Sequence, residues 1–413
     1  MLLTFSFKNY GPYRDESMFD MRAVPSYKEH EYNVMSSGGG EDTLKVAVVY
    51  GANASGKSAF VEAYDTFRAL VLFSFRAPAT DPIDADPREG PAPKEKRPFI
   101  SDCYVPFALS GRKEDTEFEA EFDVGETRFR YGFTYNSKEV TSEWLYTFNL
   151  SASTRRTTML LERSGPSSDE ISLGASVRGE CKKYLGNIPR DVLALSYFSS
   201  LNLKTDRFAA AVSGVASVLT IPKFVSDNGA AYLDSYFMYS YQDEDKQGLL
   251  DYLGDADISI KDIEVEKNEK DVRVRTLHVG PDGREYTLPL WAESTGTRKL
   301  IYLYSFVSKA TSLGRGLIID ELDSGLHPLV VRHIVSKFHA SDSRGQLIFT
   351  AHDVSLLNKR YLRRDQVWFV SKDDGNCSAL RSLSDFRVRG SASYDTAYLA
   401  GVFGSIPNIA NRV

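Results

Sequence analysis

The chain has few of the residues that build metal centres. Its 413 residues include only three cysteines and six histidines. Cys103, Cys181 and Cys377 are far apart and odd in number, which suits a reducing cytoplasm and matches no zinc-binding spacing. The histidines form no H-E-x-x-H pattern. We therefore expect a cytoplasmic protein without a dedicated metal centre.

Long apolar runs and a strong charge imbalance are also absent. No apolar run approaches the roughly 20 residues of a membrane span. The first residues, MLLTFSFKNYGPY, lack the basic head and apolar core of a secretory signal. We therefore expect no membrane association. The net charge of −6 argues against coating nucleic acid over the whole surface, although a local basic groove stays open.

The most informative stretch covers residues 44–63. An apolar, β-branched run at residues 46–50 predicts a buried strand, and helical apolar spacing follows residue 59. Between them the chain reads G-x-x-x-x-G-K-S, which we call the phosphate loop: Gly51, Ala52, Asn53, Ala54, Ser55, Gly56, Lys57 and Ser58, with Ala59 next. Strand, glycine-rich loop and helix together predict a site for a nucleoside triphosphate.

Each residue type in this loop has a physical reason. Gly51 and Gly56 allow backbone N–H groups to point inward around an anion, and the helix N-terminus adds partial positive charge. We expect Lys57 to reach the β- and γ-phosphates and the Ser58 hydroxyl to bind Mg²⁺. The alternative is a chance glycine-rich turn before a helix.

Two carboxylates follow an apolar strand in the second half of the chain. Residues 317–319 predict the strand, and Asp320 and Glu321 come directly after it. Ligands bind at this edge of a doubly wound sheet. Asp320 would hold Mg²⁺ through water, opposite Ser58, and Glu321 would polarise the attacking water. An acidic strand cap is the alternative, but the phosphate loop favours the catalytic interpretation.

A further apolar strand is predicted at residues 347–349, and His352 follows it. A histidine there can hydrogen-bond the γ-phosphate and sense its loss, although an isolated histidine is more often merely packed or exposed. In the sequence, 263 residues separate Lys57 from Asp320. Simple P-loop folds place these elements closer together, whereas ABC-type heads insert a lobe between them.

The rest of the chain divides by its pattern. Residues 1–23 predict two strands joined by a turn at 9–12, and residues 118–148 alternate as an antiparallel meander. Residues 258–290 alternate again, with a turn at 280–283. Residues 77–98 read as an exposed loop. Residues 201–256 lose the alternation, which predicts helices.

Four motifs carry a family resemblance: GANASGKS, ESTGTRKL, LIIDELDSGLHPL and LIFTAHD. They resemble the ABC-like ATPases of the structural-maintenance, RecF and overcoming-lysogenization-defect (OLD) group. More closely, the chain resembles the ATP-binding subunits of bacterial abortive-infection and phage-defence systems of the Rlo and PARIS types. FKNYGPYRDE, FRYGFTYNSKEVTSEWLY and RRDQVWFVSKDDGNCSALRSLSDF extend the resemblance over nearly the whole chain.

The resemblance implies an α/β fold: an ABC-type P-loop ATPase head with a parallel core sheet, an antiparallel β-meander lobe and a helical insert. We expect residues 1–200 to form the N-terminal part of the head, with the phosphate loop and the meander. Residues 201–256 would be the insert. Residues 257–413 would form the C-terminal part, with the remaining motifs.

Residues 294–297, the signature, match the ABC signature, which in relatives contacts the γ-phosphate of ATP held by a second subunit. The resemblance thus implies at least a homodimer, with Ser294 and Gly296 facing the partner's ATP. An ordinary helix capped by Ser294 is the alternative. The signature reads S-T-G-T instead of S-G-G-Q, and residues 324–328 depart from the usual aspartate loop. Which residue crosses the interface, and where a metal-sensing glutamine lies, stays open.

The function implied is Mg²⁺-dependent hydrolysis of ATP to ADP and phosphate. The chain would be the sensor and scaffold of an anti-phage complex and would control a separate effector nuclease encoded nearby, RloB-like or TOPRIM. DNA or a phage protein would be the trigger. The alternative is a DNA-repair or chromosome-maintenance ATPase acting on DNA ends, although no coiled-coil heptad run is present. A third option is an assembly module without a defence role.

Three further features have both a functional and a structural interpretation. The meander aromatics could stack bases, but strand core is favoured. The basic pairs at 359–360 and 363–364 could contact a nucleic-acid backbone, but a solvated helix face is favoured. Asp255 and Asp257 resemble TOPRIM metal ligands, but the preceding glutamate is missing and a loop before a strand is favoured.

Overall fold

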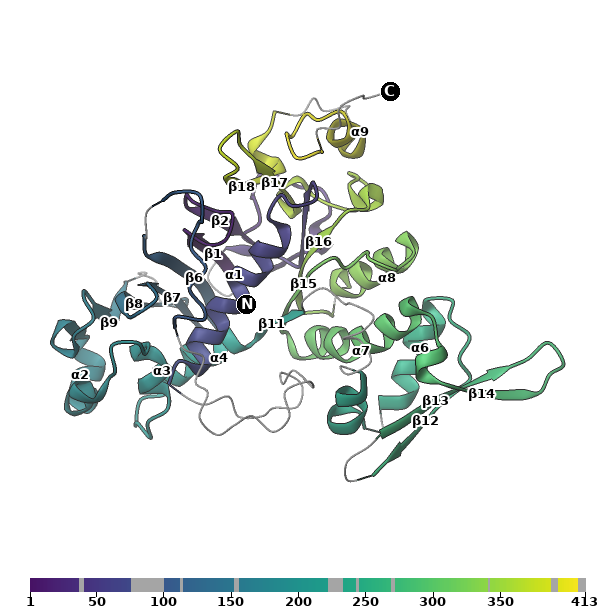
Figure 1. Ribbon diagram of the computed structural model, residues 1–413, viewed down its shortest axis with the longest axis horizontal. Helices are drawn as coiled ribbons and strands as arrows, with labels where there is room; N and C mark the ends of the chain where they lie inside the picture. Colours follow the sequence, from purple (N-terminus) through teal and green to yellow (C-terminus); the bar gives the residue numbers. More distant parts are fainter. Residues whose placement is uncertain are drawn as a thin grey trace.

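Two β-sheets with helix α1 between them form the body of the computed structural model (Figure 1). The structure describes residues 1–36, 41–75, 100–111, 114–151, 156–221, 233–242, 245–268, 272–340, 342–387 and 393–407. The predicted loop at 77–98 lies outside these ranges. Among the described residues, no helix is long and apolar enough to cross a membrane.

The first sheet is antiparallel and has seven strands in the order β10-β9-β8-β7-β6-β1-β2. The predicted N-terminal hairpin and meander are both confirmed, and pairing of β1 with β6 joins them into one sheet. The strands are β1 (Leu2–Lys8), β2 (Ser17–Asp20), β6 (Thr116–Val124), β7 (Thr127–Tyr135), β8 (Val140–Asn149), β9 (Thr158–Arg163) and β10 (Ile171–Leu173).

The second sheet carries the motifs. Its order is β11-β15-β16-β5-β17-β18, and all neighbours are parallel except the β17–β18 hairpin. The predicted parallel core sheet is therefore confirmed. Its strands are β5 (Val46–Gly51), β11 (Val218–Ile221), β15 (Gly316–Ile319), β16 (Gln346–Ala351), β17 (Val367–Lys372) and β18 (Ser378–Ser382).

Strand β5 is buried on both faces, and alternate side chains enter different cores. Ala47 and Val49 pack with α1 (Lys57–Phe73) and the antiparallel sheet. Val46, Val48 and Tyr50 pack with the helices on the opposite face, α7 (Thr295–Leu313) and α8 (Pro328–His339). A strand buried on both faces reads as a continuous apolar run, which is why the sequence revealed it.

The predicted helical insert at 201–256 is only partly helical. It contains α4 (Arg207–Ala216) and α6 (Lys246–Asp255), but residues 218–221 between them form β11, which pairs in parallel with β15. A four-residue strand with the sequence VLTI is too short to show a period, and only its partner β15 reveals it. Residues 222–232 and 243–244 are not described, and the boundaries at 200 and 256 stay a prediction.

The remaining elements surround the two sheets. The predicted alternation at 258–290 is confirmed as a three-stranded arm that projects from the body (Figure 1). Its strands are β12 (Asp262–Lys267), β13 (Val272–Val279) and β14 (Glu285–Pro289). The small elements are α2 (Ala175–Cys181), α3 (Ala194–Ser199), α9 (Tyr394–Leu399), β3 (Val34–Ser36) and β4 (Asp42–Leu44).

A half-buried histidine at the end of α8, His339, lies against the core sheet. The amide Nε2 of Gln366 lies 2.9 Å from the carbonyl oxygen of Val46 and 3.3 Å from Nε2 of His339. Burial, with the nearby positive charges of Lys45 and His30, lowers the pKa of His339 to about 3. The folded protein therefore holds this imidazole neutral.

Acid should destabilise the protein through His339. In the unfolded chain the imidazole has a pKa near 6.5, so between pH 6.5 and 3 only the unfolded state binds the proton. The free energy of unfolding should thus fall as the pH drops, by about 2 kcal/mol at pH 5 from this group. His339→Gln should remove that part of the loss, measured by urea denaturation at pH 7 and pH 5. An unchanged difference between the two pH values would contradict the assignment.

Candidate nucleotide-binding site

The phosphate loop connects the end of β5 to the start of α1, in the predicted strand, loop and helix order. Both glycines are needed for its shape. A Cβ on Gly51 would lie 2.6 Å from both Ser55 Oγ and the carbonyl oxygen of Val370. Gly56 has φ +117°, a conformation that L side chains rarely adopt, and its Cβ would lie 2.8 Å from Ser378 Oγ.

The charge of Lys57 is held at the loop itself. Its Nζ donates hydrogen bonds to the carbonyl oxygens of Gly51, at 2.8 Å, and Ala52, at 3.1 Å. Asn53, Ala54 and Ser58 are exposed to solvent, whereas Ser55 is buried. The loop thus presents its outer backbone and the Ser58 hydroxyl to a ligand, next to a fixed ammonium group.

Residues from the N-terminal and C-terminal regions of the chain hydrogen-bond the backbone of this loop. On β18, the Ser378 hydroxyl donates to the carbonyl oxygen of Ser55, and its N–H donates to that of Pro12 at 2.8 Å. The buried Tyr13 hydroxyl donates to the carbonyl oxygen of Gly56 at 3.0 Å. The sequence analysis missed these contacts because no local pattern links Ser378 to the loop. Only the motif similarity around residues 7–16 and 363–386 pointed to those regions.

Asp320 follows β15 and lies near α1. Its carboxylate is buried and accepts a hydrogen bond from the Thr350 hydroxyl at 2.6 Å. Burial raises the pKa of Glu62 on α1, and the negative charges of Asp320 and Asp65 raise it further. The negative charge of Asp320 therefore acts on Glu62, which lies one turn after Ser58 on α1.

The residues present fit Mg²⁺. Hydroxyl and carboxylate oxygens such as those of Ser58 and Asp320 are its preferred ligands, and it keeps several waters and substrate oxygens. A cluster of three or more acidic, histidine or cysteine side chains able to hold a metal does not occur in the described ranges.

Glu321 is the second residue of a tight turn at residues 320–324, which we call the carboxylate turn. Its φ of +48° is unusual for a residue with a side chain. Its N–H donates to the Thr350 hydroxyl at 2.7 Å, so one hydroxyl holds both carboxylate residues against β16. The surrounding structure thereby fixes the backbone at Glu321.

His352 follows β16 and is exposed. A carboxylate that the sequence analysis missed holds its backbone. Oδ2 of Asp323 accepts from the N–H groups of His352, at 2.7 Å, and Asp353, at 2.6 Å. The role of Asp323 could not be predicted from the sequence, because its carboxylate hydrogen-bonds the backbone of a residue 29 positions away. The signal available was its place in the motif LIIDELD.

The signature lies at the N-terminus of α7. The predicted cap is confirmed: Ser294 Oγ accepts from the N–H of Thr297 at 3.0 Å. Ser294 itself is exposed. A Cβ on Gly296 would lie 2.8 Å from the carbonyl oxygen of Gly325, so this end of α7 packs closely on the chain that follows the carboxylate turn.

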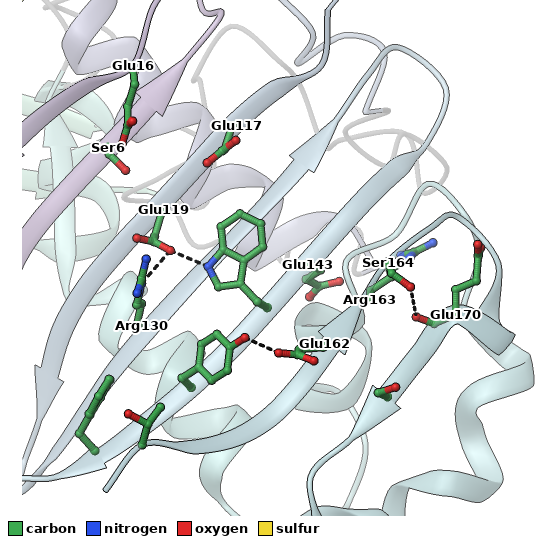
Figure 2. Close-up of a pocket in the computed structure, with 15 residues that line it drawn as sticks. Ser6, Glu16, Glu117, Glu119, Arg130, Glu143, Glu162, Arg163, Ser164 and Glu170 are labelled. Atoms are coloured by element: carbon green, nitrogen blue, oxygen red, sulfur yellow. Dashed lines mark hydrogen bonds and ion pairs between the residues drawn. The ribbon is translucent and has the colours of Figure 1, made fainter. Parts of the chain in front are cut away.

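A separate hollow of about 620 Å³ lies on the antiparallel sheet, away from these motifs (Figure 2). The meander aromatics divide between two places. Some are buried in the core, as favoured, whereas Trp144, Tyr146 and Phe148 line the hollow. Five of the other lining residues are glutamates outside the core: Glu16, Glu117, Glu119, Glu162 and Glu170. This charge would repel a nucleic-acid backbone, which disfavours base stacking there.

Arg363 and Asp255 both have structural roles. Arg363 is buried, and its guanidinium bonds the carboxylate of Asp365 at 2.8 Å and the carbonyl oxygen of Tyr27 at 3.0 Å. Arg363 therefore stabilises the fold and is not presented to a nucleic-acid backbone. Asp255 ends α6 and pairs with Lys337 at 2.8 Å, so its carboxylate is bound to a lysine.

Solved structures of similar shape include three SMC heads. One is the SmcHead bound to the C-winged helix domain of ScpA, with 15% identity, TM-score 0.43, and 92% of this chain and 97% of that chain covered. The second is the SMC head domain from Thermotoga maritima, with 13% identity and a TM-score of 0.39, and with 94% of this chain and 99% of that chain covered. The third is the Smc head domain from Pyrococcus furiosus with an extended coiled coil, bound to the C-terminal domain of ScpA. It has 11% identity and a TM-score of 0.42, and 97% of this chain and 98% of that chain are covered. TM-scores below 0.5 support no functional conclusion.

Comparison with protein families is more decisive. No curated protein sequence matches the chain. A family model described as "AAA domain, putative AbiEii toxin, Type IV TA system" matches residues 46–358, which is more than half of the chain and contains the phosphate loop, the signature, the carboxylate turn and His352. The chain is therefore of the ABC-like P-loop ATPase class, and it belongs to this family.

Proposed function

We propose that the chain is a Mg²⁺-dependent ATPase that hydrolyses ATP to ADP and phosphate. One observation carries this proposal. Strands β15, β16 and β5 are adjacent and parallel, so the carboxylate turn, His352 and the phosphate loop follow the same ends of neighbouring strands. Ligands of α/β sheets bind at that edge.

Each group then has a task in phosphoryl transfer. Residues 51–59 cradle the phosphates, and Lys57 neutralises their charge. Ser58 and Asp320 hold Mg²⁺, which supplies further neutralisation of the developing charge. Glu321 orients and polarises the attacking water, and His352 hydrogen-bonds the γ-phosphate.

We further propose that two copies complete each other's sites. Ser294 and Thr295 of the signature are exposed at the helix N-terminus, which favours an anion. In the dimer, Ser294 and Gly296 of one copy would contact the γ-phosphate held by the phosphate loop of the other. We call this arrangement a composite site.

The biological role we propose is that of the sensor and scaffold subunit of an abortive-infection complex. The motif resemblance and the toxin–antitoxin wording of the family description support it. The toxic activity would belong to a separate effector nuclease, RloB-like or TOPRIM. This separation is supported by the ion pair of Asp255 with Lys337, which engages the carboxylate that resembled a TOPRIM ligand.

Replacing the catalytic base should separate ATP binding from hydrolysis. Glu321→Gln should retain ATP, because the phosphate loop is unchanged, and should lose about 100-fold or more in kcat. The ATP-bound variant should accumulate as a dimer in light scattering. Glu117→Gln, in the hollow of the antiparallel sheet, is the matched control. Hydrolysis by Glu321→Gln at the wild-type rate would disprove the base assignment.

Mixing two inactive variants should restore activity if the sites are composite. Lys57→Ala removes the phosphate-loop charge, and Ser294→Arg blocks the exposed signature. In a mixed dimer both defects fall on one site, and the second site is intact. Random exchange should therefore recover at most about a quarter of the wild-type ATPase rate, the value for independent sites, and less if the intact site depends on closure of the other. A mixture no more active than its separate components would contradict composite sites.

The cellular role requires a partner and DNA. Expression of the natural locus should yield a complex of this chain with the effector nuclease, and the nuclease should be restrained in it. In the chromosome-maintenance alternative, DNA ends alone would strongly stimulate the ATPase, and that result would refute the defence role. The longest described helix, α7, has 19 residues, so the described ranges hold no helix of coiled-coil length that would favour the alternative.

A further inference from the structure

Lys299 is a buried lysine in the second turn of α7, only 2% exposed. Its Nζ donates to three carbonyl oxygens of one short segment: those of Glu321 at 2.9 Å, Leu322 at 3.0 Å and Ser324 at 2.8 Å. An ammonium group has three N–H donors, which these three acceptors match. Burying a charge is costly unless it is bonded in this way. Lys299 therefore holds three backbone carbonyl groups of the carboxylate turn.

The same turn is held from its other side by the end of β16. The Thr350 hydroxyl bonds Asp320 and Glu321, and the Asp323 carboxylate accepts from the N–H groups of His352 and Asp353. The turn thus lies between α7 and the His352 segment. The left-handed backbone of Glu321 persists only because its surroundings impose it. A shift of α7 would act on this backbone directly.

The signature and Lys299 lie on the same helix. Ser294 caps α7 and Lys299 lies five residues later on the same helix, which is rigid over that distance. The close approach of Gly296 to the carbonyl of Gly325 leaves no room for this helix end to slide alone over the chain after the turn. Displacement of the signature is therefore transmitted to the carboxylate turn.

We propose that Lys299 is a positioning residue that couples the two composite sites of the dimer. This inference rests on the proposed function. The signature contacts the nucleotide of the neighbouring copy, whereas Glu321 acts on the nucleotide bound by its own phosphate loop. When the signature engages the neighbour's ATP, α7 presses through Lys299 on the backbone of Glu321. Closure of one site thereby positions Glu321, the catalytic base of the other site.

The test separates coupling from mere support of the fold. Lys299→Met removes the donors, Lys299→Arg keeps the charge but presents a planar fork, and Lys309→Met is the control on the same helix. For each variant we would measure the melting temperature, ATP affinity, ATP-driven dimerisation and kcat. The Ser294→Arg variant, whose signature cannot engage the neighbour's ATP, supplies the rate without closure.

We expect Lys299→Met to bind ATP and to dimerise within about twofold of wild type, because neither the phosphate loop nor the signature is altered. Its kcat should fall about 10- to 100-fold, the cost of a misplaced catalytic group. The rate in the dimer should approach the rate without closure. Lys299→Arg should be intermediate, since its fork reaches fewer of the three carbonyls, and Lys309→Met should match wild type.

Several results would overturn the coupling. An unchanged kcat in folded Lys299→Met would do so. Loss of dimerisation together with kcat would do so as well, because Lys299 would then only stabilise the dimer interface. If Lys299→Met does not fold, Lys299→Arg decides: wild-type kcat refutes the proposal, and reduced kcat in an intact dimer supports it. A wild-type protein that does not hydrolyse ATP refutes the proposed function and the coupling together.

Discussion

Parallel pairing of β15 with β16 and of β16 with β5 is the constraint on which the candidate site depends. Ile319 lies opposite Phe349, and Ala351 lies opposite Tyr50, so each strand ends within two residues of its neighbour in the sheet. Each strand is fully buried, which leaves the polar residues that follow it as the first that can meet a ligand. Register thus converts three distant motifs into one site.

Around that edge, the structure uses backbone groups more than side-chain pairs. Ser378 and Tyr13 hold carbonyls of the phosphate loop, Asp323 holds two N–H groups beside His352, and Lys299 holds three carbonyls of the carboxylate turn. Backbone groups buried at such turns must find partners, because they lack those of a helix or sheet. The supporting residues satisfy them and at the same time set the positions of the loops.

Much of the fold followed from pattern alone. The period of two in the meander and the apolar runs of β5, β15 and β16 were sufficient, because strands buried on one or both faces leave a clear trace. Strand β11 was missed, since four residues within a helical region show no period. Asp323 and Ser378 were missed because neither a period nor a spacing reports a contact made across the fold.

The sequence by itself determined the class of chemistry. Gly51, Gly56, Lys57 and Ser58, with Asp320 and Glu321, predict a phosphate and metal site through residue type and local spacing. The tertiary structure alone decided how the motifs are linked: the signature packs on Gly325, Lys299 of the same helix holds the carboxylate turn, and the turn holds the His352 segment. Those links depend on strand order and helix packing over hundreds of residues, which local sequence does not encode.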